Sequence, residues 1–276
     1  IRRPPRSTQG VSSAASDVYK RQVKTMFLNQ QQVSDYKTNG FITGIQVTEE
    51  DETQRYRDLF DQLETKEARE KCQIGLVDRH FDQKFIWELA THPSILDCVS
   101  DLIGPDVLLL ATHFFCKYGP QEKFVAWHQD VTYWGLEPAE AITAWFAIDD
   151  SDRENGCMSV IPESHHDGIR EHGKSDQAGN LLSINQEASV TQEDEKRAFD
   201  LILKAGEMSI HHGKIIHGSL PNRSTRRRCG LTIRYIPPWV KQIEENSMKR
   251  GWKVILLRGQ DQEKNFGECP MPFSIN

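Results

Sequence analysis

The sequence predicts a mainly β fold, a sandwich or barrel, with α-helices packed on its outside in the N-terminal part. Apolar side chains recur at helical spacing over residues 28–103. After Gly104 the chain changes to short runs rich in β-branched and aromatic residues, separated by Gly, Pro, Asn and Asp. With 276 residues the chain is long enough to bury one large core.

The N-terminal part predicts four helices. The first carries Val33 and Tyr36 and ends at Gly40, because glycine readily adopts the left-handed conformation that closes a helix. Pro93 opens the last helix and Gly104 closes it, the usual asymmetry of helix ends. We expect these helices to cover the outside of a sheet. The second, third and fourth are expected over residues 49–70, 85–91 and 93–103.

The remainder of the chain predicts six strands and one long polar interval. Residues 168–196 contain several Gly and Asn, which predicts a loop or lid between strands. No internal repeat is visible. The strands are expected over residues 107–118, 141–149, 158–161, 207–210, 214–217 and 229–236.

Residues 1–22 differ from the rest, with five basic side chains against one acid, Asp17. An Arg- and Ser-rich transit peptide has such a composition, but the stretch VSSAASDVYKRQ resembles leader fragments that recur at the ends of translated environmental reads. We expect residues 1–22 to be a non-native or disordered leader. Residues 23–276 are expected to form a single domain.

Composition argues against several functions. A net charge of −6, a pI near 6.0 and a mean hydropathy of −0.60 give no basic excess to attract nucleic acid. The longest apolar runs are far shorter than the roughly 20 residues that cross a membrane. Six cysteines without a C-x-x-C pair suggest neither a zinc knuckle nor a disulfide framework. We therefore expect a cytoplasmic protein with reduced thiols and neither a nucleic-acid nor a membrane partner.

The motif Trp127-His128-Gln129-Asp130 is the strongest local signal for chemistry. His128 and Asp130 are two residues apart, so on a strand they project from the same face and can bind one metal ion. Such a pair alone is more often a surface or hydrogen-bonded pair than a ligand pair. A third candidate ligand further along the chain changes this interpretation.

That third candidate is His217, which we expect at the end of an apolar strand because it follows Ile215 and Ile216. Eleven residues on, Arg228 precedes the next β-rich run, so a return strand can bring its guanidinium back towards the metal. An arginine there can bind a carboxylate with two parallel N–H donors.

A competing register uses His212, which also has an arginine eleven residues later, Arg223. Only the His217 register follows an apolar strand and has a serine, Ser219, at the second position after the ligand, so we favour it. For the other histidines nearby we expect structural roles. We expect His211 and His212 to be hydrogen-bonded in or beside the sheet, with His212 close to the ligands, and His165 and His166 to lie in a turn near the rim of the site.

From about residue 28 to the C-terminus, the sequence resembles the phytanoyl-CoA dioxygenase-like family of Fe(II)/2-oxoglutarate-dependent oxygenases. The resemblance implies a double-stranded β-helix, the jelly-roll or cupin-like core of this family, with iron near one open end. It also implies Fe(II) as cofactor and 2-oxoglutarate and O2 as cosubstrates. The most specific segments are WHQDVTYW, TAWFAIDDSDRENGCMSVIPESHH and IIHGSLPNRSTRRRCGLTIRYIPP.

The resemblance assigns a role to each motif residue. Three protein ligands on one face of an octahedral iron leave three positions open, two for the keto acid and one for O2. Lys117 matches a basic position of the family. On the same strand, His113 stands where relatives have Gln or Asn, so the sequence does not decide which residues of this strand contact 2-oxoglutarate. The implied roles are metal ligation by His128, Asp130 and His217, binding of the far 2-oxoglutarate carboxylate by Arg228 with help from Ser219, and cosubstrate contacts from Trp145 and Lys117.

The implied reaction is hydroxylation of an unactivated C–H bond with release of succinate and CO2. Asp130 favours hydroxylation over halogenation, because halogenating relatives have a small residue at that position. Desaturation, epoxidation and ring rearrangement stay open. We expect a small polar or zwitterionic substrate and a monomer or homodimer. Thr132, Tyr133 and Trp134 are candidates for the substrate pocket, and equally for core packing.

Three other functions compete with this one. The protein could hydroxylate an acyl-CoA, as phytanoyl-CoA dioxygenase does, or it could be a non-catalytic jelly roll that binds a metal or a small acid. A zinc-dependent hydrolase could use the same three ligands, but no H-E-x-x-H motif is present, and Arg228 and Ser219 would have no role. We expect Arg226 and Arg227 to be solvated or salt-bridged, not phosphate contacts.

Overall fold

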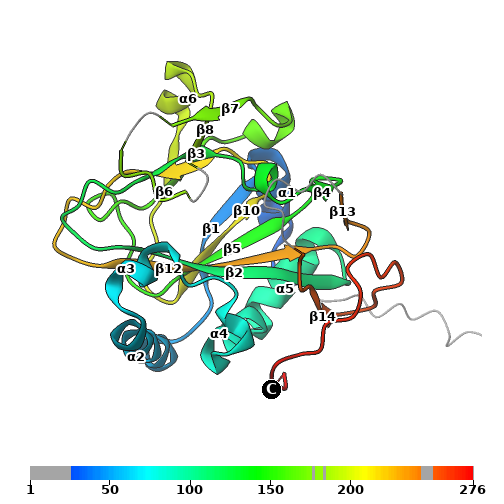
Figure 1. Ribbon diagram of the computed structural model, residues 1–276. Coiled ribbons are helices and arrows are strands. Elements are labelled where there is room, and N and C mark those ends of the chain that lie inside the picture. Colours follow the sequence, from blue (N-terminus) through cyan, green and yellow to red (C-terminus); the bar gives the residue numbers. More distant parts are fainter. Residues whose placement is uncertain (1–25, 176–177, 183–184, 244–250, 276) are drawn as a thin grey trace, which may run out of the picture.

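The computed structural model describes residues 26–175, 178–182, 185–243 and 251–275. A major sheet has the strand order β1-β10-β5-β12-β2-β14, and a minor sheet has the order β3-β11-β6-β9. All the strand pairs within them are antiparallel. In Figure 1 the minor-sheet strands β3 and β6 lie on one side of the major sheet and α2, α3 and α4 on the other. This arrangement confirms a double-stranded β-helix with helices outside it.

The strands of the major sheet are β1 (Phe41–Gln46), β10 (Glu207–His212), β5 (Ile142–Ala147), β12 (Arg228–Ile236), β2 (Val107–Lys117) and β14 (Ile255–Arg258). Those of the minor sheet are β3 (Val125–His128), β11 (His217–Ser219), β6 (Met158–Val160) and β9 (Phe199–Leu201). Two short pairs complete the described strands: β4 (Leu136–Glu137) with β13 (Lys241–Gln242), and β7 (His172–Lys174) with β8 (Gln186–Ala188).

The predicted helices are confirmed, with small changes at their ends. Gly40 closes the first in the left-handed conformation, at φ 85°. Pro93 occupies the first turn of α5, and Gly104 caps its end. The second helix stops earlier than predicted because Ala68 has φ 66°, and a short helix follows it. The bounds are α1 (Gln30–Asn39), α2 (Glu50–Glu67), α3 (Arg69–Ile74), α4 (Lys84–Ala90), α5 (Pro93–Ile103) and α6 (Gln192–Arg197), with 3-10 turns η2 (Arg79–Phe81), η3 (Asp130–Tyr133) and η4 (Ser164–Asp167).

Strict alternation along β12 separates the core from the interior of the jelly roll. The apolar residues at odd positions pack with the helices, and the hydroxyl of Tyr235 donates to the carbonyl of Ala90 at 2.9 Å. The even positions carry Arg228, Thr232 and Arg234, which face a cavity between the sheets. One strand therefore supplies both the helix-covered core and the polar wall of the cavity.

Three predictions about the chain path are wrong. Residues 41–46 form strand β1 inside the stretch interpreted as helical, and Gly44, at φ 71°, lies in a bulge that breaks the alternation by which a strand is recognised. Residues 214–216 are a turn, so His217 begins a strand and does not end one. The polar interval 168–196 contains the β7–β8 pair and α6.

Other expectations have mixed outcomes. All six cysteines are free, and all but Cys269 are buried. Within the described residues, no helix combines the length and apolar character needed to cross a membrane. The leader predicted at residues 1–22 lies outside the described residues. A single domain over residues 23–276 stays a prediction.

His80 predicts how stability depends on pH. Burial lowers its pKa to about 4, although Asp78 and Asp82 counteract this, and its Nδ1 lies 2.9 Å from the hydroxyl of Thr112. An unfolded histidine titrates near 6.5, so the folded state binds fewer protons between these values and stability falls as pH falls. From pH 7.5 to pH 5, His80 should account for a loss of about 2 kcal/mol in the free energy of unfolding.

Urea denaturation at both pH values measures this loss, with His80→Gln as the non-titrating control. The variant should lose about 2 kcal/mol less than the wild type over the interval. Equal losses in the two proteins would contradict the assignment.

Candidate active site

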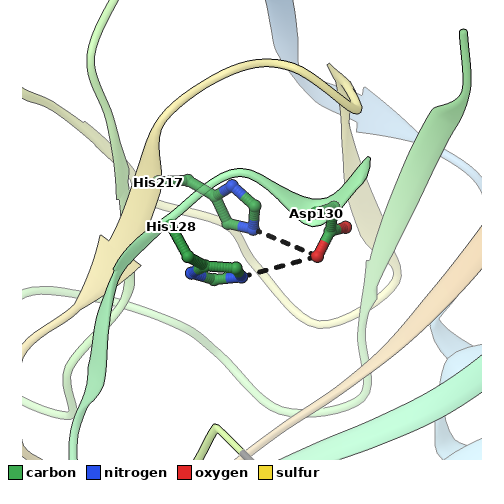
Figure 2. A group of neighbouring side chains, drawn as sticks. All are labelled: His128, Asp130 and His217. Atoms are coloured by element: carbon green, nitrogen blue, oxygen red, sulfur yellow. Dashed lines mark ion pairs between the residues drawn. The ribbon is translucent and has the colours of Figure 1, made fainter. Parts of the chain in front are cut away.

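His128, Asp130 and His217 meet in the interior of the jelly roll, as Figure 2 shows. Asp130 Oδ1 lies 3.4 Å from Nε2 of His128 and 3.9 Å from Nε2 of His217. The three side chains are 4–6% exposed, and one candidate ligand atom from each lies within 4.8 Å of the others. The arrangement can hold one metal ion with two nitrogens and one oxygen.

Antiparallel pairing brings the histidines together, because His217 at the start of β11 lies directly opposite His128 at the end of β3. Asp130 does not lie on a strand as predicted but opens η3. It still projects to the side of His128, because the intervening Gln129 is extended, with φ −117° and ψ 121°. The spacing argument therefore gives the right neighbours through a different local structure.

Gln129 itself faces away from the ligands and is fully buried. Its Nε2 donates to the carbonyls of Gly168 and Lys214 at 2.8 and 2.7 Å, and its Oε1 accepts from the backbone N–H of Arg170 at 2.8 Å. The residue between the two candidate ligands thus joins the motif to two other chain segments.

Both histidines present the nitrogen that a metal needs. Nδ1 of His128 lies 2.9 Å from the carbonyl oxygen of Ala126, and Nδ1 of His217 lies 3.1 Å from that of Ile215. A carbonyl can only accept, so these bonds place the proton on Nδ1 and leave a lone pair on Nε2. Burial, together with His128 and His211, holds the pKa of His217 well below its usual value, so it stays neutral as a ligand must.

Asp130 stays ionised although it is buried. Burial raises the pKa of this carboxyl, but the positive charge of the nearby Arg234 outweighs it and holds the pKa well below its usual range. Its second oxygen, Oδ2, accepts a hydrogen bond from the hydroxyl of Thr143 at 3.2 Å. The site therefore offers a carboxylate, the hard oxygen donor that suits a divalent ion.

Next to the three residues, a small cavity of about 40 Å³ reaches the buried cation Arg228, and a second buried basic residue, Lys117, lies behind Ser219 at the same end. Arg228 and Lys117 are each 2% exposed and lie opposite each other on β12 and β2. Lys117 donates to the hydroxyl of Ser219 at 2.6 Å and also to the carbonyl of Leu220. Nε and Nη2 of Arg228 donate to the carbonyl of Gly156 at 3.1 and 2.8 Å.

The positive charge at this end of the cavity is not balanced by any carboxylate that the structure describes. Within the described ranges, no carboxylate forms an ion pair with Lys117 or Arg228. Burial lowers the pKa of Arg228 to about 10, and burial with repulsion from Arg228 lowers the pKa of Lys117 well below its usual value. Unpaired buried charges are costly, so the arrangement favours an anionic ligand at this end.

Trp145 lines the cavity next to Arg228. Its ring lies 5.1 Å from Cζ of Arg228. Gly230 makes room for it, because a Cβ atom there would lie 2.0 Å from Cζ2 of the indole. Of the predicted neighbours, Trp145, Ser219 and Arg228 therefore line one end of the cavity, and Lys117 contacts Ser219 from outside it.

The three candidates for the substrate pocket do not gather in the same way. Trp134 is buried in a separate apolar cluster and packs edge-on against Trp252, at a ring-centroid distance of 6.4 Å. Neither Trp134 nor Thr132 is among the residues that line the cavity. Core packing accounts for Trp134, and the side chain of Tyr133 lies outside the described parts.

The residues of the competing register lie elsewhere. Nε2 of His212 is 3.0 Å from Glu140, and Arg223 is exposed and paired with Glu122. His165 and His166 occupy the predicted turn, η4, with their Nε2 atoms 3.2 Å from carbonyls at the end of α1. His113 directs Nε2 to the carbonyl of Ile74, and Arg226 and Arg227 form the expected salt bridges, with Asp152 and with Asp149 and Asp61.

His211 differs from its prediction. It is 1% exposed, and neither ring nitrogen has a hydrogen-bond partner within the described parts of the chain. Alternation along β10 places Met208 and Ile210 in the helix-covered core, so His211 faces the cavity. Burial is the main cause that lowers its pKa to about 4.

The sequence analysis missed several other wall residues. A period-of-two interpretation of RCGLTIRY would have found two of them, because Thr232 and Arg234 share a face with Arg228. Phe115, Val125 and Met158 are apolar, so their side chains carry no local signal of a binding site. The missed lining residues are Phe115, Val125, Met158, His211, Thr232 and Arg234.

Fold and site together define a class: a cupin-like jelly roll with the 2-His-1-carboxylate arrangement typical of non-haem iron oxygenases, beside a pocket for an anion. The family model described as phytanoyl-CoA dioxygenase (PhyH) matches residues 36–230. The chain therefore belongs to the phytanoyl-CoA dioxygenase family of Fe(II)/2-oxoglutarate-dependent oxygenases.

Individual relatives agree with this. The chain is 25% identical over 257 residues to the peroxisomal phytanoyl-CoA dioxygenase of Bos taurus, covering 83% of this chain and 75% of the bovine one. It is 26% identical over 147 residues to a probable alpha-ketoglutarate-dependent hypophosphite dioxygenase of Stutzerimonas stutzeri, 53% of this chain and 51% of that one. The solved structure of the non-heme monooxygenase ThoJ in its apo form superposes with a TM-score of 0.73 at 27% identity, covering 88% and 89% of the chains.

Replacing His217 tests the metal centre. His217→Ala should weaken binding of Co(II) or Mn(II) by more than about a hundredfold, because loss of an outer partner alone typically costs 10–100-fold and this change removes a ligand. Competition titration against a chelator of known affinity measures it. His212→Ala is the matched control and should bind metal like the wild type. Normal affinity in His217→Ala, with loss in His212→Ala, would reverse the register.

Proposed function

We propose that this protein is an Fe(II)/2-oxoglutarate-dependent hydroxylase that acts on an unactivated C–H bond of a small polar or zwitterionic metabolite, releasing succinate and CO2. The single observation that carries the proposal is that the His128, Asp130 and His217 cluster shares a cavity with the buried Arg228, which has no ion-pair partner within the described residues. Family membership supports the cofactor and the cosubstrate.

The residues present fit both groups. Nε2 of each histidine and Oδ1 of Asp130 supply three donors for Fe(II), which, when bound, activates O2 for attack on the substrate. Arg228 would bind the far carboxylate of 2-oxoglutarate with the N–H groups that Gly156 leaves available. Lys117 orients the hydroxyl of Ser219 towards the same end, and Trp145 closes the cavity beside it.

Electrostatics make the cosubstrate part of the site. Burial lowers the pKa values of Arg228 and Lys117, and no carboxylate in the described parts forms an ion pair with either. A dicarboxylate that reaches from the metal to Arg228 supplies that charge and excludes water from the cavity. Binding of 2-oxoglutarate should therefore also stabilise the fold.

The substrate class rests on the walls that remain. Beside the three-residue cluster, Thr232, Arg234 and His211 are polar or charged, which favours a polar substrate over a long acyl chain, although Phe115, Val125 and Met158 add an apolar part. An acyl-CoA hydroxylase is the second candidate, favoured by the likeness to phytanoyl-CoA dioxygenase. We further propose a cytoplasmic monomer or homodimer that requires neither nucleic acid nor membrane.

Succinate release tests the proposal. Purified protein with Fe(II), ascorbate and 2-oxoglutarate should form succinate. Zwitterionic metabolites and acyl-CoA esters are then added in separate reactions, and we expect the zwitterionic metabolites to raise the rate of succinate release. No succinate under any condition would leave a binding protein or a hydrolase. Stimulation by acyl-CoA esters alone would favour the second candidate.

Arg228→Lys tests the carboxylate site, because it keeps the charge and removes the planar fork. Loss of one charge-assisted hydrogen bond, about 1.5–3 kcal/mol, should weaken 2-oxoglutarate binding by roughly tenfold to a hundredfold. Anaerobic titration of the Fe(II) protein, followed by its metal-to-ligand charge-transfer band, measures the affinity.

Arg223→Ala is the control for this experiment, since Arg223 is exposed and paired with Glu122. It should bind 2-oxoglutarate like the wild type, and metal affinity should barely change in either variant. Unchanged 2-oxoglutarate affinity in Arg228→Lys, with a loss in Arg223→Ala, would overturn the assignment of Arg228.

A further inference from the structure

Arg234 is a buried cation at the opposite end of the cavity, and neither the metal ligands nor the carboxylate site uses it. It is 8% exposed, and its Nε lies 3.5 Å from Oδ2 of Asp130. Its Cζ lies 5.1 Å from the ring centre of Trp134, which fixes the guanidinium from the other side. Asp130 is its ion-pair partner within the described residues.

Arg234 is one of three side chains that face Asp130 from a single row across the major sheet. In register, Arg234 on β12 lies opposite Thr143 on β5, and Thr143 lies opposite His211 on β10. Thr143 donates to Oδ2 of Asp130 at 3.2 Å, and Nε2 of His211 is 4.0 Å from the same oxygen. The row thus contacts Oδ2, whereas His128 and His217 face Oδ1.

The division between the two oxygens has a chemical consequence. On an octahedral metal ion with two histidine ligands, a carboxylate that binds through one oxygen leaves three positions open. A carboxylate that binds through both oxygens leaves only two. Two positions are enough for a keto acid but leave none for O2. An oxygenase with this ligand set therefore needs its carboxylate held in the single-oxygen mode.

We propose that Arg234, together with Thr143, is a positioning residue that holds Oδ2 of Asp130 against the major sheet, so that only Oδ1 reaches the metal. This inference rests on the proposed function, since it concerns the same metal centre. It predicts that loss of the row changes how many positions on the metal stay open, which a purely structural ion pair would not do.

The test counts water molecules on Mn(II) bound to the protein, by water-proton relaxation, before and after saturation with 2-oxoglutarate. The wild type should hold about three waters, falling to about one. Arg234→Met should hold about two, falling to none, because Asp130 turns and binds through both oxygens. Thr143→Val, a near-isosteric change, should shift the count in the same direction and serves if Arg234→Met does not fold.

Two controls separate this inference from the proposed function. Arg228→Met should keep about three waters and lose affinity for 2-oxoglutarate, and Arg234→Lys should recover part of the wild-type count because it restores a cation. Wild-type counts in both Arg234→Met and Thr143→Val would overturn the inference and leave the proposed function intact. A wild-type protein that binds no Mn(II) would overturn both.

Discussion

Strand β12 runs through the major sheet between β2 and β5, and its pairing on both sides constrains nearly everything around the cavity. The odd-numbered residues of β12 must be apolar because the helices cover them. The even-numbered residues must fit into the enclosed space between the two sheets. Pairing with β2 sets Arg228 opposite Lys117, and pairing with β5 sets Arg234 opposite Thr143. A shift by one residue would exchange core and cavity, so the register is fixed by burial on both faces.

The cavity built on this strand is polarised along its length. At one end two cations lie close together without a carboxylate in the described chain, and at the other Arg234 is matched by Asp130. Between them burial lowers the pKa values of His217 and His211, which keeps these two histidines neutral. Positive potential thus increases from Asp130 towards Arg228, which suits the proposed binding of a dicarboxylate between them.

The sequence predicted the parts of this arrangement that local patterns encode. Caps such as Gly40 and Gly104 act within one turn of chain, so the helices followed from the sequence alone. The spacing of His128 and Asp130 and the residue types around His217 identified the cluster, although the strand assigned to residues 214–217 was wrong. The local pattern could have placed Arg234 on the cavity wall, but not beside Asp130. Its neighbours there, and those of His211, depend on sheet register, because both residues lie opposite Thr143 although they are more than 60 positions from it in the chain. Trp134 was a plausible wall residue only until its packing against Trp252 was known.

The buried amide of Gln129 has a mechanical consequence for this cavity. It bonds to the backbone at Gly168, Arg170 and Lys214, so the segment between His128 and Asp130 cannot move without breaking contacts to both neighbouring loops. Local opening of residues 168–170 and distortion of the ligand spacing are therefore one cooperative event, not two independent ones. Anything that orders those loops also stiffens the segment that carries the ligands, and a hydrogen-exchange experiment would find the protection of the three segments rising and falling together.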